Sequence, residues 1–376
     1  MSIEVKQAVT DTSNTTKELY SSVAQLAWRK FKAHRLARIG ATVLAALYLI
    51  AIFSDFIAPY PVAYRHKGFR DTPPTKIHIK SEITGEYRRP FIYAYTRTKD
   101  PVSLRPLYNE NKEKEYTIRF FCAGPETKFW GIFRMQTRLF CVDENVPIFL
   151  FGTESVSRDV FSRSMVGSRI SLFIGLGGVA ISFVLGGIIG GISGYIGGLL
   201  DEGIQRTIDL LMGITTLPIW IGLSAAVPDN WSVGKTYFAI TIVLSVVGWT
   251  GLAREVRGKL LALREMDFVT AARVSGSSTY QIIVGHLLPN FSSHLIVSIT
   301  LAIPAMILGE TALSFIGLGM KDPGVSWGVL LQECLGFTPL IYAPWKLIPS
   351  IFVVITVLMF NFLGDGLRDA TDPYSL

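Results

Sequence analysis

A tripeptide in this sequence matches the part of a nucleotide site that holds phosphate. Gly234, Lys235 and Thr236 reproduce the end of a P-loop, whose backbone N–H groups and lysine bind phosphate oxygens. A P-loop also needs a glycine at position 229, where this chain has Asp229, and a strand before it, which this sequence does not predict. We therefore expect no nucleotide site and no cofactor in this chain, and no other arrangement of its residues indicates catalysis or metal binding.

Three cysteines could do redox chemistry. Cys122 and Cys141 both fall in residues 59–168, a long segment of mixed polarity. If that segment lies on the oxidising side of a membrane, the two can form a disulfide. Spacing alone does not fix pairing, so two free thiols remain the alternative. Cys334 is expected on the same side and has no obvious partner.

The composition indicates a membrane protein. Of the 376 residues, 49% are hydrophobic, and the mean hydropathy is +0.39 even with the polar segment included. Several apolar windows are about 20 residues long, enough to cross a hydrocarbon layer roughly 30 Å thick. Because lipid offers the backbone no hydrogen-bond partners, each run must be helical, and the runs are too continuous for barrel strands. The sequence predicts an all-α polytopic membrane protein.

We expect about six spans, each long enough for the bilayer. They are Ile39–Ala58, Ile170–Gly191, Ile204–Val227, Tyr237–Leu252, Leu295–Leu313 and Leu347–Leu363. Lys and Arg are dense before the first span and after the fourth span. This places both flanks in the cytoplasm and, with them, both termini. Residues 59–168 then form a large extracytoplasmic insert between the first two spans. The formal net charge of +7 fits this bias and anionic lipid, and no recognised module indicates nucleic-acid binding.

The chain divides accordingly into four parts. They are a cytoplasmic tail with a basic interfacial helix (1–38), the first transmembrane helix (39–58), the insert (59–168) and a core with helices 2–6 (169–376), which contains a cytoplasmic loop at 254–290. Within the insert, the β-prone stretches Tyr93–Tyr95, Tyr116–Phe121 and Ile148–Phe151 suggest a small β-rich element.

Small and polar residues inside the spans predict how the helices pack. Four glycines recur every fourth residue and allow a second helix to approach closely: Gly186, Gly190, Gly194 and Gly198. Pro218 can kink the third span. In the fifth span, Pro304 and Glu310 are candidates for lining a path through the membrane. Glu310 could instead pair near the outer interface or be protonated.

A polar stretch, Asp267–Asn290, interrupts the apolar blocks and reads as two short helices. Asp267 is a candidate N-cap, and Gly276 can end the first helix in the left-handed conformation. Ser278 and Gln281 fit a capping box that starts the second. This much order in a loop predicts a docking surface, although an ordinary amphipathic loop helix is the alternative.

This stretch resembles the EAA loop of permease subunits of ABC importers. The match comprises Ala271, Ala272, Gly276, His286 and Pro289, and Thr270 stands where the family usually has glutamate. In that family the loop forms a coupling helix that sits in a cleft of a cytosolic ATPase. The resemblance therefore implies that these residues contact an ATPase, with the polar contact at Thr270 changed.

A second motif resembles the segment before the second span of oligopeptide and dipeptide permeases. Its matching residues are Gly152, Thr153, Arg158, Asp159, Val160, Ser162 and Arg163, whereas Glu154 and Ser157 depart from it. Arg158, Asp159 and Arg163 would tie an amphipathic segment to the outer membrane surface. The alternative is a helix flank whose charges are merely solvated.

Together with stretches near Leu313–Gly328, Ala343–Trp345 and Asn361–Pro373, the resemblance covers most of residues 150–376. It favours the second, C-type permease of oligopeptide or dipeptide importers and implies the type I ABC importer permease fold. It also implies a second permease, two ATPases that bind ATP and magnesium, an external substrate-binding protein and a bacterial inner membrane. Peptides are the family's usual substrate, and nickel or sugars are alternatives. A secondary transporter or a non-transport membrane scaffold is a different class, but no inverted repeat is evident.

Overall fold

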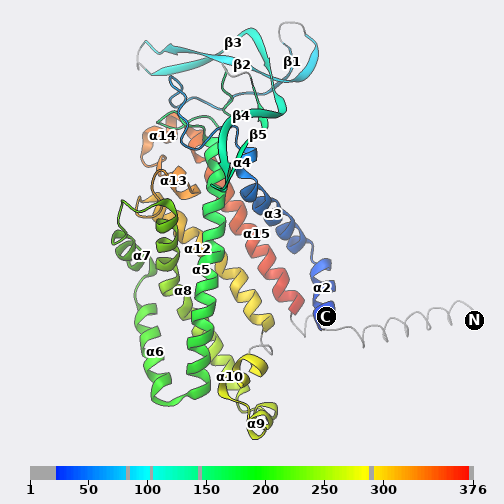
Figure 1. Cartoon of the computed structure of the whole chain (residues 1–376), viewed down its shortest axis with the longest axis vertical. Coiled ribbons are helices and arrows are strands. Elements are labelled where there is room, and N and C mark those ends of the chain that lie inside the picture. Colours follow the sequence, from blue (N-terminus) through cyan, green and yellow to red (C-terminus); the bar gives the residue numbers. More distant parts are fainter. Residues whose placement is uncertain (1–22, 82–84, 102–104, 143–145, 288–291, 372–376) are drawn as a thin grey trace, which may run out of the picture.

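The structure, a computed structural model, describes residues 23–81, 85–101, 105–142, 146–287 and 292–371. A bundle of long helices has strands at one end and the short helices α9 and α10 at the other (Figure 1). Five described helices are long and apolar enough to cross a membrane, or six if one bent pair is a single span. This agrees with the expected all-α core.

The N-terminal segment forms α2 (Val23–Ala33), α3 (Arg35–Ile52) and the single turn α4 (Ser54–Ile57). The first apolar helix begins four residues before the expected Ile39 because His34 caps it, accepting a hydrogen bond at Nδ1 from the Ala37 N–H at 3.1 Å. The expected basic helix is present as α2. It packs on the last helix, where Phe31 and Ala370 are buried together.

The insert contains five strands in two antiparallel sheets. They are β1 (His78–Lys80), β2 (Tyr87–Lys99) and β3 (Pro106–Thr117) in one sheet, and β4 (Arg119–Phe129) and β5 (Phe133–Cys141) in the other. In the structure Cys122 and Cys141 form a disulfide between β4 and β5, and Cys334 is a buried free thiol.

Two of the three expected β-prone stretches lie in strands, but Ile148–Phe151 does not. Ile148 and Phe149 are fully buried in a segment without regular secondary structure. Their apolar character reflects packing beneath the sheets rather than strand pairing.

Helix α5 (Val160–Ile196) begins ten residues before the expected Ile170, inside the range assigned to the insert. The Asp159 side chain caps it by accepting a hydrogen bond from the Ser162 N–H at 2.7 Å. The helix packs along α8 (Val233–Leu263), which continues eleven residues past the expected Leu252.

Three of the four spaced glycines make the contact between α5 and α8 possible. A Cβ atom at Gly186 would lie 2.9 Å from the Trp249 carbonyl oxygen, and one at Gly194 would lie 2.9 Å from that of Arg257. A Cβ at Gly190 would meet the Ala253 backbone, with its Cα at 2.8 Å. Gly198 lies beyond the end of α5 and touches nothing on α8. The predicted ridge is therefore confirmed over three positions.

The expected third span is broken. Helices α6 (Gly198–Gly213) and α7 (Thr216–Ala225) are bent by 89°. The break falls at Ile214, which adopts extended backbone angles, and not at Pro218. Pro218 lies in the first turn of α7, where its missing N–H breaks no helical hydrogen bond.

The remaining elements complete the core. They are α9 (Asp267–Val274), α10 (Thr279–Gln281), the π-helix η1 (Ile282–Leu287), α12 (Ser292–Phe315), α13 (Trp327–Gln332), α14 (Phe337–Tyr342), the 3-10 helix η2 (Pro344–Leu347) and α15 (Ile348–Thr371). Buried residues of α3, α5, α8, α12, α13 and α15 form one apolar cluster.

We predict that Gly190→Val destabilises the bundle, because the added side chain collides with the backbone of α8 rather than with a side chain that can move. Overpacking of this kind costs about 1–3 kcal/mol. Thermal unfolding of the purified chain in detergent measures it. Gly187→Val is the matched control, since nothing lies within 4 Å of a Cβ there. Equal unfolding midpoints for the two variants would contradict the prediction.

Candidate functional site

The polar stretch forms a compact surface at one end of the bundle. Gly276 ends α9 with a φ of +82°, donating its N–H to the Arg273 carbonyl at 3.0 Å, while Ser277 donates to Ala272 at 3.1 Å. These two bonds make a Schellman motif, which requires the left-handed residue. The expectation that Gly276 stops the first helix is confirmed.

The start of the second helix is also as expected. The Ser278 N–H donates to Gln281 Oε1 at 2.8 Å, and the Gln281 N–H donates to Ser278 Oγ at 3.3 Å. This is the reciprocal pair of a capping box. The prediction that Asp267 is the N-cap is wrong, because Met266 occupies that position. Asp267 lies in the first helical turn, where its carboxylate interacts favourably with the helix dipole.

One face of α9 is buried and the other is open. Val269 and Ala272 pack with Leu260 of α8 and with Ile282 and Leu295. Thr270 and Ala271 are exposed on the other face. Three large apolar side chains nearby are also exposed, namely Phe268, Val274 and Tyr280. The structure describes the backbone of His286 in η1 but not its side chain, and Pro289 lies outside the described residues.

The same surface is tied to the far end of α5. Arg273 Nε donates to the Tyr195 hydroxyl at 3.1 Å, and its guanidinium lies 5.2 Å from the centre of that ring. Together with the buried face, this contact joins α9 to three long helices, α5, α8 and α12. A displacement of α9 would disturb its packing on these helices, because packed interiors deform little.

The second motif lies at the opposite end, where its charges are buried rather than solvated. The side chains of Glu154 and Arg163 are each 2% exposed, and Arg163 Nε lies 3.3 Å from Glu154 Oε2. Arg158 pairs with Glu154 and, at 2.6 Å, with Asp322. Arg163 reaches Asp322 at 3.4 Å. These four residues form an ion cluster, in which the Asp322 side chain is 51% exposed. The burial of Glu154, Arg158 and Arg163 contradicts the alternative of solvated charges, and the place of the motif at the outer membrane surface stays a prediction.

The two guanidinium groups keep Asp322 ionised. Partial burial raises the pKa of the Asp322 carboxyl, but hydrogen bonds and charge from Arg158 and Arg163 lower it. The net shift of this pKa is downward. The loop that carries Asp322 connects α12 to α13, so the cluster joins that loop to the beginning of α5.

Gly152 and Thr153 attach the motif to the insert. Thr153 Oγ1 donates to the Phe69 carbonyl at 2.6 Å and accepts from the Thr72 N–H at 2.8 Å. Gly152 has a φ of +72°, and a Cβ there would lie 2.6 Å from both the Thr72 carbonyl oxygen and the Trp345 ring. Only glycine fits both requirements.

A second ion cluster beside the first was not predicted from the sequence. Lys346 Nζ lies 2.6 Å from Asp71 and 3.2 Å from Glu333, and Ser155 Oγ donates to Glu333 at 2.6 Å. These residues are far apart in the chain and carry no motif. Their only signal was that each lies in a segment expected at the outer ends of the spans.

His66 lies beneath the motif in an aromatic cluster. Its ring centre is 4.4 Å from that of Tyr60 and 4.9 Å from that of Phe149. The backbone N–H of His66 donates to the Ser157 carbonyl at 2.8 Å. Burial lowers the pKa of His66 from 6.5 to about 4. The folded chain therefore holds this ring neutral.

Glu310 and Pro304, the candidates for a path, are buried in the bundle. Glu310 is fully buried, and its carboxylate accepts hydrogen bonds from Ser314 Oγ at 2.7 Å and Ser171 Oγ at 3.4 Å. Ser171 Oγ also accepts from the backbone N–H of Trp327 at 3.0 Å. In this conformation Glu310 holds α5, α12 and α13 together, and its role in a path stays a prediction.

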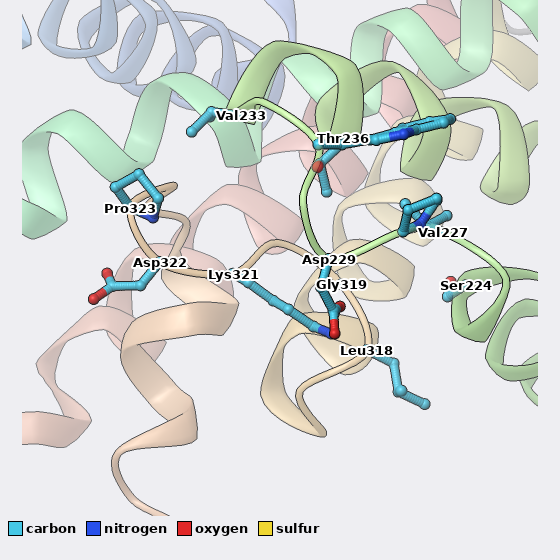
Figure 2. A pocket seen from close by; sticks show the side chains of 12 residues that line it. Ser224, Val227, Asp229, Val233, Thr236, Leu318, Gly319, Lys321, Asp322 and Pro323 are labelled. Carbon is cyan, nitrogen blue, oxygen red and sulfur yellow. The ribbon is translucent and has the colours of Figure 1, made fainter.

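A small cavity lies where the α7–α8 loop meets the α12–α13 loop (Figure 2). Its volume is about 30 Å³, enough for roughly one water molecule. Lys321 and Asp229, which line it from opposite loops, pair at 2.5 Å. Thr236 also lines it, and the tripeptide that resembles a P-loop lies in the first turn of α8, which begins at Val233. The cavity is thus a small space beside the Lys321–Asp229 ion pair, between the two loops that this pair joins.

Comparison with known proteins gives two family matches. The model described as binding-protein-dependent transport system inner membrane component matches residues 184–374. The model described as N-terminal TM domain of oligopeptide transport permease C matches residues 22–74.

Relatives match most of the chain. The dipeptide transport system permease protein DppC of Bacillus subtilis is 31% identical over 364 residues, which cover 96% of this chain and 89% of the relative. The oligopeptide transport system permease protein OppC of Haemophilus influenzae is 42% identical over 224 residues, 59% of this chain and 70% of the relative. A chain of the inward-facing MetNI methionine ABC transporter is 18% identical, with a TM-score of 0.42, and the match covers 55% of this chain and 95% of that chain.

The helical bundle with its ordered loop is thus that of an integral membrane permease subunit and not of an enzyme. The chain belongs to the family of binding-protein-dependent transport system inner membrane components, in the branch of the C-type oligopeptide and dipeptide ABC permeases. This membership confirms the resemblance and the type I importer permease fold that it implied.

We predict that Arg163→Met destabilises the chain strongly, because it leaves a buried carboxylate with one fewer cation. Breaking a buried pair typically costs about 3–5 kcal/mol. Arg206→Met is the control: Arg206 and Glu202 are 4.0 Å apart and 76% and 65% exposed, and such a pair is worth about 0–1 kcal/mol. Unfolding of both variants in detergent checks this, and similar losses would show that the cluster is not structural.

We further predict that acid destabilises the chain partly through His66. The unfolded ring gains a proton near pH 6.5, whereas the buried ring does so near pH 4. The contribution of the neutral His66 ring to the free energy of unfolding is therefore complete above pH 6.5 and is lost as the pH falls towards 4. The measurement is the unfolding midpoint between pH 7.5 and 4.5 for the wild type and His66→Phe. The unfolding midpoint of His66→Phe should fall less with decreasing pH than that of the wild type. Parallel curves of midpoint against pH would refute the role of His66 in acid destabilisation.

Proposed function

We propose that this chain is the C-type permease subunit of an ATP-driven peptide importer, and that it forms the translocation path together with a second permease. The match to a dipeptide permease over 96% of the chain carries this proposal. Names of other relatives point the same way, since they are oligopeptide permeases.

Two ATP-binding subunits supply the energy, one on this chain and one on the second permease. ATP and magnesium bind to those subunits. The exposed face of α9, with Thr270, Ala271, Phe268 and Val274, is the surface offered to the ATPase. Its apolar character suits a protein partner, because burial of such side chains drives association.

The bundle converts movement of α9 into a change of access. Because α9 is fixed to α5, α8 and α12, a pull by the ATPase would shift these helices as bodies rather than bend the loop. The path would then open alternately to each side. An external substrate-binding protein delivers the peptide at the end that carries the insert.

The membrane is the bacterial inner membrane, with both termini in the cytoplasm. In support, α2 and the end of α15 lie in the same half of the bundle as α9, away from the insert (Figure 1). Basic residues of α2 and of the α8–α9 region agree with the positive-inside rule. The insert then faces the oxidising side, which suits the Cys122–Cys141 disulfide.

The test is reconstitution of this chain with the second permease, the ATPase pair and the binding protein in liposomes. We expect uptake of a labelled peptide to require ATP and to survive an ionophore that collapses ion gradients. Uptake by the isolated chain, or uptake that needs the gradient but no ATP, would overturn the proposal.

In the same assay, Gly276→Val should lower uptake by about tenfold while the chain still inserts into the membrane, since a β-branched residue at positive φ costs roughly 1–3 kcal/mol and deforms the loop. Gly258→Val is the matched control, because Gly258 lies in the end of α8 that leads into this loop, has no positive φ and has open space around it. Normal coupling in the Gly276 variant would contradict the role of this loop.

A further inference from the structure

The hairpin of β4 and β5 ends in an exposed apolar tip. The tip, residues 129–133, presents Ile132 at 72% exposure and Phe133 at 68%. Phe53, at the end of α3, is 48% exposed and lies 6.4 Å from the Phe129 ring. Clusters of large exposed apolar side chains are rare on the water-facing surfaces of proteins, so this patch indicates contact with an apolar partner.

The tip is fixed at the depth where two spans end. Trp130 Nε1 donates to the carbonyl of Ile52, the last residue of α3, at 3.1 Å. Its ring lies 5.9 Å from that of Phe173, inside the apolar stretch of α5. In Figure 1 the two strands lie beside α4 and the adjacent end of α5. The tip is therefore at the boundary of the hydrocarbon layer that these helices cross.

Arg138 holds the hairpin in this place. Its side chain is 1% exposed and donates to the carbonyls of Ala58 at 3.2 Å and Pro125 at 2.8 Å. The disulfide between Cys122 and Cys141 closes the other end of the hairpin. The tip is thus a rigid projection and not a loose loop.

Cations surround the apolar tip. Lys128 and Arg134 flank it and are exposed, and Arg134 forms a solvent-exposed pair with Glu126 at 3.4 Å. The Arg169 guanidinium lies 4.2 Å from the centre of the Trp130 ring and pairs with Asp55 at 2.8 Å. A tryptophan with exposed apolar neighbours and flanking cations is the composition that binds the interface of a bilayer, where the rings meet acyl chains and the cations meet phosphates.

We propose that the β4–β5 tip is a lipid-binding element that enters the leaflet at its own end of the bundle. Ile132 and Phe133 lie among the acyl chains, Trp130 lies at the headgroup level, and Lys128 and Arg134 bind lipid phosphates. The N–H groups of the turn already have partners: those of Gly131 and Ile132 donate to the Lys128 and Phe129 carbonyls, and that of Trp130 donates to Asp55 Oδ2. The turn can therefore enter an apolar layer without leaving these donors unsatisfied. The insert is thereby fastened both to the helices and to the membrane beside them.

The test uses the full chain with a photoreactive p-benzoylphenylalanine in place of Phe133, reconstituted in vesicles of phosphatidylethanolamine and phosphatidylglycerol. Thr137 on the same strand, also exposed, is the control position. We expect at least about fivefold more lipid adduct at 133 than at 137 by mass spectrometry, because only the tip reaches the leaflet. The label at Ile132 repeats the test should the first variant fold poorly, with the intact disulfide as the check of folding.

Equal lipid yields at the tip and at the control position would overturn the proposal. So would crosslinking of the tip to a protein subunit, instead of lipid, in the assembled importer. In vesicles of the same composition, Lys128→Gln combined with Arg134→Gln should lower the adduct yield at 133, and an unchanged yield would remove the phosphate contact from the proposal.

Discussion

The ion cluster of Glu154, Arg158, Arg163 and Asp322 constrains the half of the molecule that carries the insert. Glu154, Arg158 and Arg163 are buried, whereas the Asp322 side chain is half exposed, and each buried charge costs several kcal/mol unless it is paired. Their partners come from the loop before α5 and from the α12–α13 loop, so the helices that carry these loops must meet. Polar contacts also attach the insert to this end of the bundle. Thr153 is hydrogen-bonded to Phe69 and Thr72, and Lys346 pairs with Asp71. The insert is consequently part of the bundle's end rather than a separate appendage.

Helix α5 connects this cluster to the opposite surface. With 37 residues at 1.5 Å each it is about 55 Å long. Arg163 lies in its first turn, and Tyr195, near its end, contacts Arg273 of α9. Between them, Gly186, Gly190 and Gly194 bring α5 against the backbone of α8. A helix held this close to its neighbour at three successive turns has little room to adjust, which suits a part that carries displacement from one end of the molecule to the other.

Features that depend on neighbours in sequence were predicted well. The Schellman stop at Gly276 and the capping box of Ser278 and Gln281 were read correctly because each is closed by residues three or four positions apart. The glycine ridge was read from helical periodicity in the same way. Errors arose where a distant contact decided the outcome. Ile148–Phe151 is buried without being a strand, and α6 and α7 are two helices rather than one span.

The sequence by itself determined the class: the length of the apolar runs fixed a polytopic helical protein, and the motif spacings pointed to the permease family. Tertiary structure alone decided what the charged motif does, because Arg163 finds Asp322 across 159 positions of the chain. It also decided that Glu310 is bonded by serines inside the bundle, and that Trp130 reaches the end of α3. Local spacing records the interactions a residue makes within its own helix or turn. The partners of a buried charge or an exposed ring depend on which elements pack together, and no spacing in the chain specifies that.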